Sequence, residues 1–310
     1  MLSSLCRLLS GMLLFFAGMA LLRKGLKRGT GARVEKALRR LAHKPATAVL
    51  VGALATCSMQ SSSAVTVITV SLVDSGVIDV YQAFCIVMGA NLGTCLTAYI
   101  VALETRVLAP LALVASLCTY ICMRQRFGRD PAVVFLGLGC ILEGVELTGS
   151  ALTWLGSVPW FLHVLVVFGQ IPFFGVLAGA SFTGVIQSSS ATTAILVGLV
   201  REGLVNLRSA ISLALGSNIG TCVTTLIISL AASSAGRLTA QLHLVFNVVG
   251  VIAVLPVFNG FVALVEVLSP IDPGYRLANA HTLFNLVSVL IVFPWCRRFV
   301  DVVKGRREWI

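Results

Sequence analysis

The chain has 310 residues, of which 57% are hydrophobic and 11% are charged. This composition excludes an ordinary soluble domain, in which about 25% of the residues carry a charge. One helical crossing of a bilayer needs roughly 20 predominantly apolar residues, and several stretches of the chain supply them. We therefore predict an all-α polytopic protein of the cytoplasmic (inner) membrane, with the lipid bilayer as its surroundings.

The formal net charge is +11, from 23 Lys and Arg against 12 Asp and Glu. A basic balance can indicate nucleic-acid binding, but here the basic residues gather in short segments beside apolar stretches. These segments are residues 23–44, 124–129 and 297–307. The positive-inside rule puts such segments on the cytoplasmic face. We predict that the basic loop 23–44 and the C-terminal tail are cytoplasmic, and that no nucleic acid binds.

The apolar stretches predict the following elements in chain order. The first, Leu5–Leu22, is long for a signal-peptide core and lacks a small-residue cleavage site, so it is expected to be a retained helix. Residues Pro45–Val73 are too many for one comfortable crossing and suit two half-helices. Residues Phe261–Leu268 are not assigned. Full crossings are expected at Leu8–Leu22, Gln82–Leu103, Val107–Met123, Leu242–Phe258 and Ala280–Trp295.

An internal repeat organises the chain. Gln60-Ser61-Ser62-Ser63 recurs as Gln187-Ser188-Ser189-Ser190, and the segment from Gly89 to Thr94 recurs from Gly216 to Thr221, both at an offset of 127. Without a gap, 18 of the 38 positions from Gln60 to Thr97 match. Self-similarity of this kind indicates two copies of one structural unit. We divide the chain into repeat 1 (1–130), repeat 2 (131–258) and a C-terminal segment (259–310).

The charge pattern predicts that the two repeats have opposite topology. The loop after the first helix of repeat 1 carries nine Lys and Arg, whereas its counterpart, residues 149–171, carries none. Equivalent loops would then lie on opposite faces of the membrane. Inversion requires an odd number of crossings per repeat, which is satisfied if the segment around each serine motif is a re-entrant helical hairpin. Inverted repeats with broken helices are typical of secondary transporters.

The serine motifs suggest an anion site. At the tip of each hairpin, three consecutive hydroxyl groups and free backbone amides would gather at a helix N-terminus, where the helix dipole favours an anion. In the inverted arrangement the two tips would meet near the middle of the bilayer. The candidate anion ligands are Gln60, Ser61, Ser62, Ser63, Gln187, Ser188, Ser189 and Ser190.

An anion at this depth needs positive charge, and no Lys or Arg lies near the motifs within the apolar stretches. Sodium bound beside the anion would supply it and would couple the two. We also expect the GxNxGT segments to interrupt their helices and to free carbonyl oxygens for the cation. The candidate sodium ligands are Asn91, Thr94, Asn218, Thr221, Thr66 and Thr193. Arg106 and Arg201, at segment ends, are candidates for gating or attraction.

Other polar residues carry a weaker signal. An HxxFN pattern occurs twice, at His243 and Asn247 and again at His281 and Asn285. Buried ionisable groups in membranes are often functional, although a packing role is equally consistent with the pattern. Glu143 and Glu146, one helical turn apart, suit either a cation or proton site or a helix end near the interface. The nine cysteines include no CxxC pair and are interpreted as small packing residues.

In these paired motifs the chain resembles the sodium/phosphate cotransporter family, the type II group and its bacterial relatives, from about Gly11 to Asn285. The resemblance implies sodium-driven movement of inorganic phosphate, with the hairpin serines on phosphate and neighbouring Gln, Asn and Thr groups on sodium. Animal members have an HxxFN element after GxNxGT in both halves, whereas repeat 1 here has Ser116 and Tyr120 at those places. Many bacterial relatives also carry a soluble domain after the last helix, which is not expected here.

The sequence therefore predicts a sodium-coupled phosphate transporter that works by alternating access, with no cofactor beyond the coupling ion. Alternatives are a transporter of another small anion, a phosphate exporter, or a membrane receptor or scaffold. Enzyme function is not expected, because the chain contains no GxSxG, HExxH or P-loop motif. The stoichiometry, the direction of transport and the oligomeric state, with a homodimer as one option, are left open.

Overall fold

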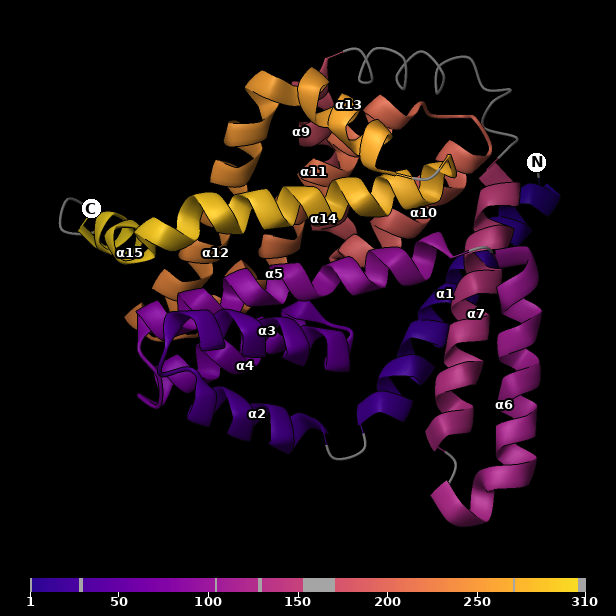
Figure 1. The fold of residues 1–310 in the computed structure, drawn as a ribbon, viewed down its shortest axis with the longest axis horizontal. Helices are drawn as coiled ribbons and strands as arrows, with labels where there is room; N and C mark the ends of the chain where they lie inside the picture. Colours follow the sequence, from indigo (N-terminus) through magenta and orange to yellow (C-terminus); the bar gives the residue numbers. More distant parts are fainter. Residues whose placement is uncertain are drawn as a thin grey trace.

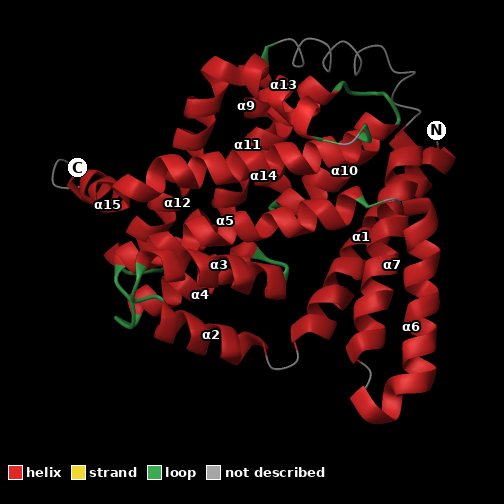
Figure 2. Ribbon diagram, in the orientation of Figure 1, coloured by secondary structure: helices red, strands yellow, loops and turns green. Residues whose placement is uncertain are grey.

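The structure, a computed structural model, describes residues 2–27, 30–103, 105–127, 130–152, 171–269 and 271–305. Every regular element in these ranges is helical, and short loops join the helices (Figure 2). The helices are α1 (Leu2–Lys27), α2 (Thr30–Leu41), α3 (Pro45–Met59), α4 (Ser62–Asp74), α5 (Val80–Ala102), α6 (Thr105–Phe127), α7 (Asp130–Leu152), α9 (Pro172–Ile186), α10 (Ser189–Arg201), α11 (Leu207–Ser229), α12 (Ser234–Val254), η2 (Leu255–Val257), α13 (Phe258–Leu268), α14 (Pro273–Val292), η3 (Phe293–Trp295) and α15 (Cys296–Gly305).

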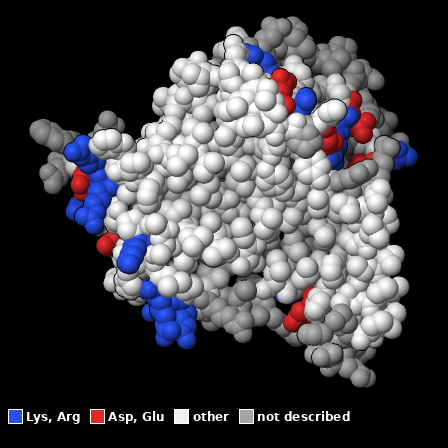
Figure 3. All heavy atoms as spheres, in the orientation of Figure 1, with Lys and Arg blue, Asp and Glu red and all other residues white. Residues whose placement is uncertain are grey.

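Several helices are long and apolar enough to cross a membrane. The expected spans Val107–Met123 and Ala280–Trp295 are helical, but neither is among the helices that are long and apolar enough for a crossing. The unassigned segment Phe261–Leu268 lies in α13. A broad uncharged surface separates charged margins in the space-filling view (Figure 3). Within the described ranges, five stretches meet the length and composition of a crossing: Cys6–Leu26, Val80–Ala102, Asp130–Thr148, Leu207–Ser229 and Ser234–Leu268.

Each serine motif separates two short helices, as the sequence predicts. Helices α3 and α4 flank the first motif and are called the first hairpin, and α9 and α10 flank the second motif and are called the second hairpin. The turn after each pair is also the same, because Gly76 and Gly203, 127 residues apart, have φ values of 69° and 70°. Such positive φ values favour glycine. The two copies therefore share their backbone conformation as well as their sequence.

Glycines of the GxNxGT segments pack the long helices against the short ones. A Cβ on Gly89 would lie 1.9 Å from the carbonyl oxygen of Val49 on α3, and one on Gly216 would lie 2.0 Å from that of Val176 on α9. Our expectation that these segments interrupt their helices is wrong, since α5 and α11 are continuous through them. The glycines serve close packing between helices, as small residues often do in membranes.

The first helices of the two repeats pack against each other in antiparallel fashion. Gly11 approaches the carbonyl oxygen of Gly144, and Gly18 approaches that of Gly137. The contacts are reciprocal, because Gly137 approaches Gly18 and Gly144 approaches Gly11 in return. Since Gly11 and Gly18 are the repeat counterparts of Gly137 and Gly144, a single close-packed seam joins equivalent helices that run in opposite directions.

Helices α12 and α14 form a second pair of equivalent elements. His243, Phe246, Asn247 and Pro256 recur as His281, Phe284, Asn285 and Pro294 at an offset of 38, and each long helix is followed by a 3-10 turn and a short helix. Helix α14 lies along α5 (Figure 1), and both α12 and α14 pack against α5 and α11.

Helix α6 instead packs against α7, and the Ser116 hydroxyl donates to the Ala132 carbonyl oxygen. Thus α14, rather than α6, brings an HxxFN motif to repeat 1. The HxxFN element that repeat 1 lacks in its own sequence is supplied by the C-terminal segment.

The basic segment 23–44 is largely helical, although we expected a loop. Helix α1 continues to Lys27, and α2 covers Thr30–Leu41. Val34, Leu38 and Ala42 recur every fourth residue and are buried against α3 and α4, while Lys36 and Arg40 face outward. This spacing gives one apolar stripe on a charged helix. Helix α2 is therefore amphipathic, and it packs against the first hairpin.

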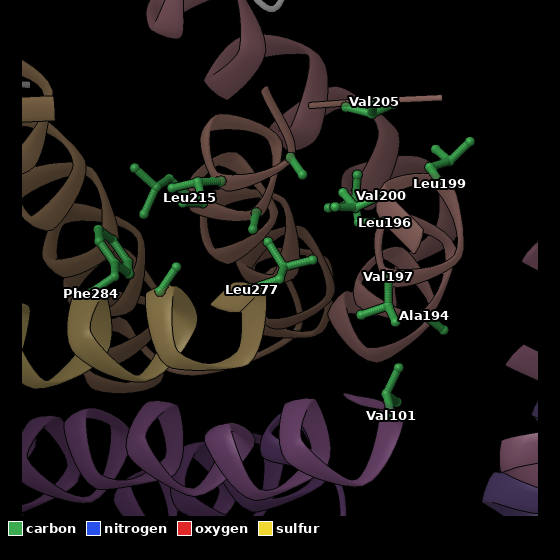
Figure 4. Packing of buried hydrophobic residues seen from close by; sticks show 14 of the residues in the cluster. Val101, Ala194, Leu196, Val197, Leu199, Val200, Val205, Leu215, Leu277 and Phe284 are labelled. Atoms are coloured by element: carbon green, nitrogen blue, oxygen red, sulfur yellow. The ribbon is translucent and has the colours of Figure 1, made fainter. Parts of the chain in front are cut away.

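Two clusters of buried apolar side chains surround the two hairpins. One joins the first hairpin and α5 to α2, α12 and α15, and the other joins the second hairpin and α11 to α7, α13 and α14. In the second, Leu277 and Phe284 of α14 face side chains of α10 and α11 above Val101 of α5 (Figure 4). Each hairpin is thus packed into an apolar cluster together with one of the two long helices.

The glycine packing gives a first prediction. Gly89→Ala would place a Cβ against the backbone of α3, which cannot give way as a flexible side chain can. We expect the substitution to lower the free energy of unfolding by about 1–3 kcal/mol, as overpacking does, measured as a lower thermal midpoint in detergent. Gly260→Ala, where a Cβ meets no atom within 4 Å, is the control. Equal midpoints for the two variants would contradict the packing role.

Candidate functional site

Each hairpin breaks at a glutamine in the left-handed backbone conformation. Gln60 has a φ of 50° and Gln187 a φ of 57°, and they are the non-glycine residues with positive φ in the described part of the chain. The Gln60 amide donates to the Thr56 carbonyl oxygen at 2.7 Å, and the Gln187 amide to that of Thr183 at 2.6 Å. This conformation ends a helix and is unfavourable for a residue with a side chain. The same unfavourable conformation therefore occurs at the equivalent position of both repeats.

The serine after each glutamine starts the next half-helix. The Ser61 hydroxyl accepts from the Ala64 amide at 3.2 Å, and the Ser188 hydroxyl from the Ala191 amide at 3.3 Å. These are N-caps, and they leave the amides of the next residues at the positive end of a helix. Ser62 and Ser63, like Ser189 and Ser190, occupy these first helical positions. Each tip thus presents hydroxyl groups together with amide N–H groups.

The two tips meet in one small polar cavity of about 30 Å³. Its lining residues in the described part of the chain are all serine, threonine or glutamine. None of these lining residues is a lysine or an arginine. All eight predicted anion ligands contribute. The lining residues are Thr56, Gln60, Ser61, Ser62, Ser63, Thr94, Thr97, Gln187, Ser188, Ser189, Ser190 and Thr221.

Two cavity residues, Thr56 and Thr97, were missed by the sequence reasoning. Thr97 Oγ1 donates to Gln60 Oε1 at 2.9 Å and thereby orients the glutamine side chain. Thr56 Oγ1 is buried and has no hydrogen-bond partner among the described residues, which is costly unless a ligand or water provides one. The repeat could have revealed both positions, because Thr183 and Thr224 are their counterparts at the offset of 127.

The predicted sodium ligands fall into two groups. Thr94 and Thr221 line the cavity. Thr66 and Thr193 are buried outside its lining, and the Thr66 hydroxyl donates to the Ser62 carbonyl oxygen at 2.9 Å. Asn218 donates to the Ala214 carbonyl oxygen of its own helix at 3.1 Å. In this conformation four of the six candidate sodium ligands do not line the cavity. They are Thr66, Thr193, Asn218 and Asn91.

The HxxFN residues form the layer behind the cavity. Asn91 Nδ2 donates to Asn247 Oδ1 at 2.9 Å, and its Oδ1 lies 3.2 Å from His243 Nε2. Asn247 Nδ2 also lies 3.3 Å from Cys222 Sγ on α11, so one side chain links both long helices. His281 Nε2 lies 3.1 Å from the hydroxyl of Thr94, a cavity residue. His281 therefore contacts a residue of the cavity wall directly, whereas His243 and Asn247 contact Asn91 behind it.

The second HxxFN copy is less fully bonded than the first. Asn285 Nδ2 lies 3.9 Å from Cys95 Sγ, which mirrors the contact of Asn247 with Cys222. However, Asn285 Oδ1 is buried without a partner among the described residues, and Asn218 bonds to its own helix. The amide bridge between Asn91 and Asn247 thus has no equivalent in the other half. Glu143 and Glu146, on α7, do not line the cavity.

Two further polar contacts tie the hairpins to the ends of other helices. Arg201, at the end of α10, forms an ion pair of 3.1 Å with Asp272 and donates to the Ala102 carbonyl oxygen at 2.7 Å. Its counterpart at the offset of 127 is Asp74, at the end of α4, which accepts from the Ser233 hydroxyl at 2.5 Å. Asp272 and Ser233 are the N-caps of α14 and α12. The side chain of Arg106 lies outside the described residues.

Comparison with known proteins identifies relatives of the whole chain and of parts of it. It is 33% identical over 268 residues to YqeW of Bacillus subtilis, described as uncharacterized, and the match covers 86% of each protein. It is 29% identical over 269 residues to the "Putative inorganic phosphate export protein YjbB" of Salmonella typhimurium. This match covers 86% of this chain and 49% of that protein. The chain therefore spans about half the length of YjbB. No solved structure matches.

Animal proteins match a shorter part. The human "Sodium-dependent phosphate transport protein 2C" is 36% identical over 126 residues, which is 37% of this chain and 20% of that protein. The family model described as Na+/Pi-cotransporter matches residues 14–150 and 158–267, which include both hairpins and both long helices of the cavity. The chain is thus a multi-pass membrane protein that belongs to the Na+/Pi-cotransporter family.

Proposed function

We propose that this chain carries inorganic phosphate across the cytoplasmic membrane together with sodium ions. The observation that supports the proposal best is the convergence of two serine-rich hairpin tips on one cavity without basic side chains. Tetrahedral phosphate offers several acceptor oxygens, and the cavity offers donors from two sides. A helix N-terminus stabilises an anion by about 0.3–1 kcal/mol, or up to about 2 when partly buried, so two ends alone do not compensate the loss of hydration.

Sodium supplies the missing charge in this proposal. We assign it to hard oxygen atoms beside the tips, first to those of Thr94 and Thr221, which line the cavity. Thr66, Thr193, Asn91 and Asn218 remain candidates in a conformation that turns them toward the cavity. An anion that binds only with its cations neutralised is coupled to them by necessity. Each uncompensated charge that crosses is then driven by about 2.3 kcal/mol per 100 mV.

We infer that the two repeats have inverted topology and that the hairpins are re-entrant. The antiparallel seam of α1 and α7 and the shared hairpin conformations support this. The contacts of Asp74 and Arg201 lie near opposite ends of α5, whose 23 residues span about 35 Å. We propose that they are equivalent closures on opposite membrane faces, opened in alternation, with α2 and α15 on the cytoplasmic face.

Phosphate export is the second candidate, because the name of YjbB describes export. The same cavity serves either direction, since a carrier is reversible and the gradients determine the net flux. The family consists of transporters, which agrees with our expectation of no enzyme activity. Measurement of the net phosphate flux in cells, under the gradients that the cell itself maintains, separates the two candidates.

The serine hairpins provide the central test of phosphate recognition. Ser62→Ala with Ser189→Ala removes one hydroxyl from each tip, and hydrogen bonds to a charged group contribute about 1.5–3 kcal/mol each. We expect labelled-phosphate uptake by liposomes under an inward sodium gradient to fall about tenfold or more at subsaturating phosphate. Ser181→Ala is the control, since Ser181 is exposed and bonds only within α9. Undiminished uptake by the double variant would refute phosphate binding at the tips.

The sodium assignment is tested separately at Thr221. Its hydroxyl lines the cavity and donates only to the Ser217 carbonyl oxygen of its own helix, so Thr221→Val removes a candidate ligand without breaking an interhelical bond. We expect the sodium concentration for half-maximal uptake to rise about three- to tenfold, as loss of one neutral ligand suggests. Thr239→Val, on α12, is the matched control. An unchanged sodium dependence would exclude Thr221 as a ligand.

The two closures predict effects at separate ends of the molecule. Arg201→Gln leaves Asp272 without its ion-pair partner and should speed amide hydrogen exchange at the start of α14 and the end of α5. Asp74→Ala removes the acceptor of the Ser233 amide and hydroxyl, and it should speed exchange at the start of α12 instead. Exchange followed by mass spectrometry measures both. An equal rise at both ends in either variant would indicate general destabilisation rather than two closures.

A further inference from the structure

Helix α15 lies at the end of the bundle with one apolar and one basic face. Its inner face includes Val300 and Phe299, and the Phe299 ring stacks on that of Phe84 with centroids 5.3 Å apart. Its outer face carries the exposed Arg297, Arg298 and Lys304 together with one exposed carboxylate, Asp301. Basic side chains cover this margin of the molecule beside α15 and α2 (Figure 3). An amphipathic helix of this composition is suited to lie in the interface of a membrane.

A groove of about 470 Å³ runs beside the start of α15. Both of its arginines are held by aromatic rings, with the Arg297 guanidinium 5.1 Å from the Tyr81 ring and that of Arg298 5.3 Å from the Trp295 ring. Stacking uses the flat face of a guanidinium and leaves N–H donors in its plane, where they match a phosphate. Among the described residues, no carboxylate pairs with either arginine or lines the groove.

The adjacent groove on the other side of Tyr81 has a different character. It is lined by Asp79 and Asp301 as well as Lys304, so its charges are mixed and an anion gains little there. The first groove alone combines unpaired cations with an apolar wall, which includes Phe293 and Pro294. Trp295, which is 58% exposed, is of the residue type that gathers at the headgroup level of bilayers.

We propose that this groove binds the headgroup of an anionic phospholipid, with its phosphate between Arg297 and Arg298 and its acyl chains along the exposed face of Trp295. The exposed Lys44, next to the groove residue Pro45, adds positive charge at its rim. Anionic lipids are attracted to such basic segments beside membrane spans. The site is independent of the transport cavity, because Tyr81 and Thr94 are separated by 13 residues of α5, or about 20 Å.

Native mass spectrometry of the full chain in detergent tests this proposal. Bound lipids are counted after addition of phosphatidylglycerol or, in parallel, phosphatidylcholine, to the parent protein and to Arg297→Gln with Arg298→Gln. Arg208→Gln is the matched control. Arg208 also stacks on an aromatic ring, with its guanidinium 5.3 Å from the centre of the Phe258 ring, but it does not line this groove. Arg298→Gln alone is a second variant that keeps the contact of Arg297 with Tyr81.

The expected result is preferential retention of one phosphatidylglycerol by the parent and the control. The double variant should bind it about tenfold more weakly, because charge-assisted hydrogen bonds are lost, and Arg298→Gln should show an intermediate loss. Equal retention of both lipids by the parent, or unchanged retention by the variants, would overturn the proposal. Competition by millimolar inorganic phosphate through the same arginines would also overturn it, since the groove would then be a site for free phosphate.

Discussion

The functional architecture depends on the left-handed break at one glutamine in each hairpin. A continuous helix would satisfy its own amides and offer nothing to a ligand inside the membrane. The break at Gln60 and at Gln187 ends one helix and starts another, so that N-terminal amides and serine hydroxyls face the cavity. Unsatisfied backbone groups are tolerated at membrane depth only where protein or a wet cavity surrounds them. The dense packing around the hairpins is therefore a requirement of the site.

Glycine contacts provide that packing and repeat it in both halves. The approach of Gly89 to Val49 recurs as the approach of Gly216 to Val176, which holds each broken pair against a continuous helix. The halves nevertheless differ in their polar contacts. Asn91 bridges to Asn247, whereas Asn285 lacks the corresponding bond. Unequal contacts in two copies of one unit are consistent with the alternating access that we propose, in which the halves would exchange conformations during the cycle.

The break at each serine motif and the meeting of the two tips were predicted from the sequence, because they depend on local motifs that occur twice in register. Both serine motifs lie at breaks and line one cavity, and Thr94 and Thr221 join them. The GxNxGT segments were misjudged, since glycine in a sequence does not distinguish a break from a close helix contact. Helix α2 was missed because its charge concealed the apolar stripe of Val34 and Leu38, which Ala42 continues just after the helix. The place of α14 beside α5 depends on tertiary packing that no local pattern encodes.

The central claim is that both hairpins hold one phosphate together with sodium. Equilibrium binding of labelled phosphate to the purified protein, at fixed ionic strength in sodium or in potassium, tests it most directly. The account predicts one phosphate per chain, bound in sodium and not in potassium. Two phosphates per chain would mean that the tips act as separate sites, and equal binding in potassium would contradict charge compensation by sodium.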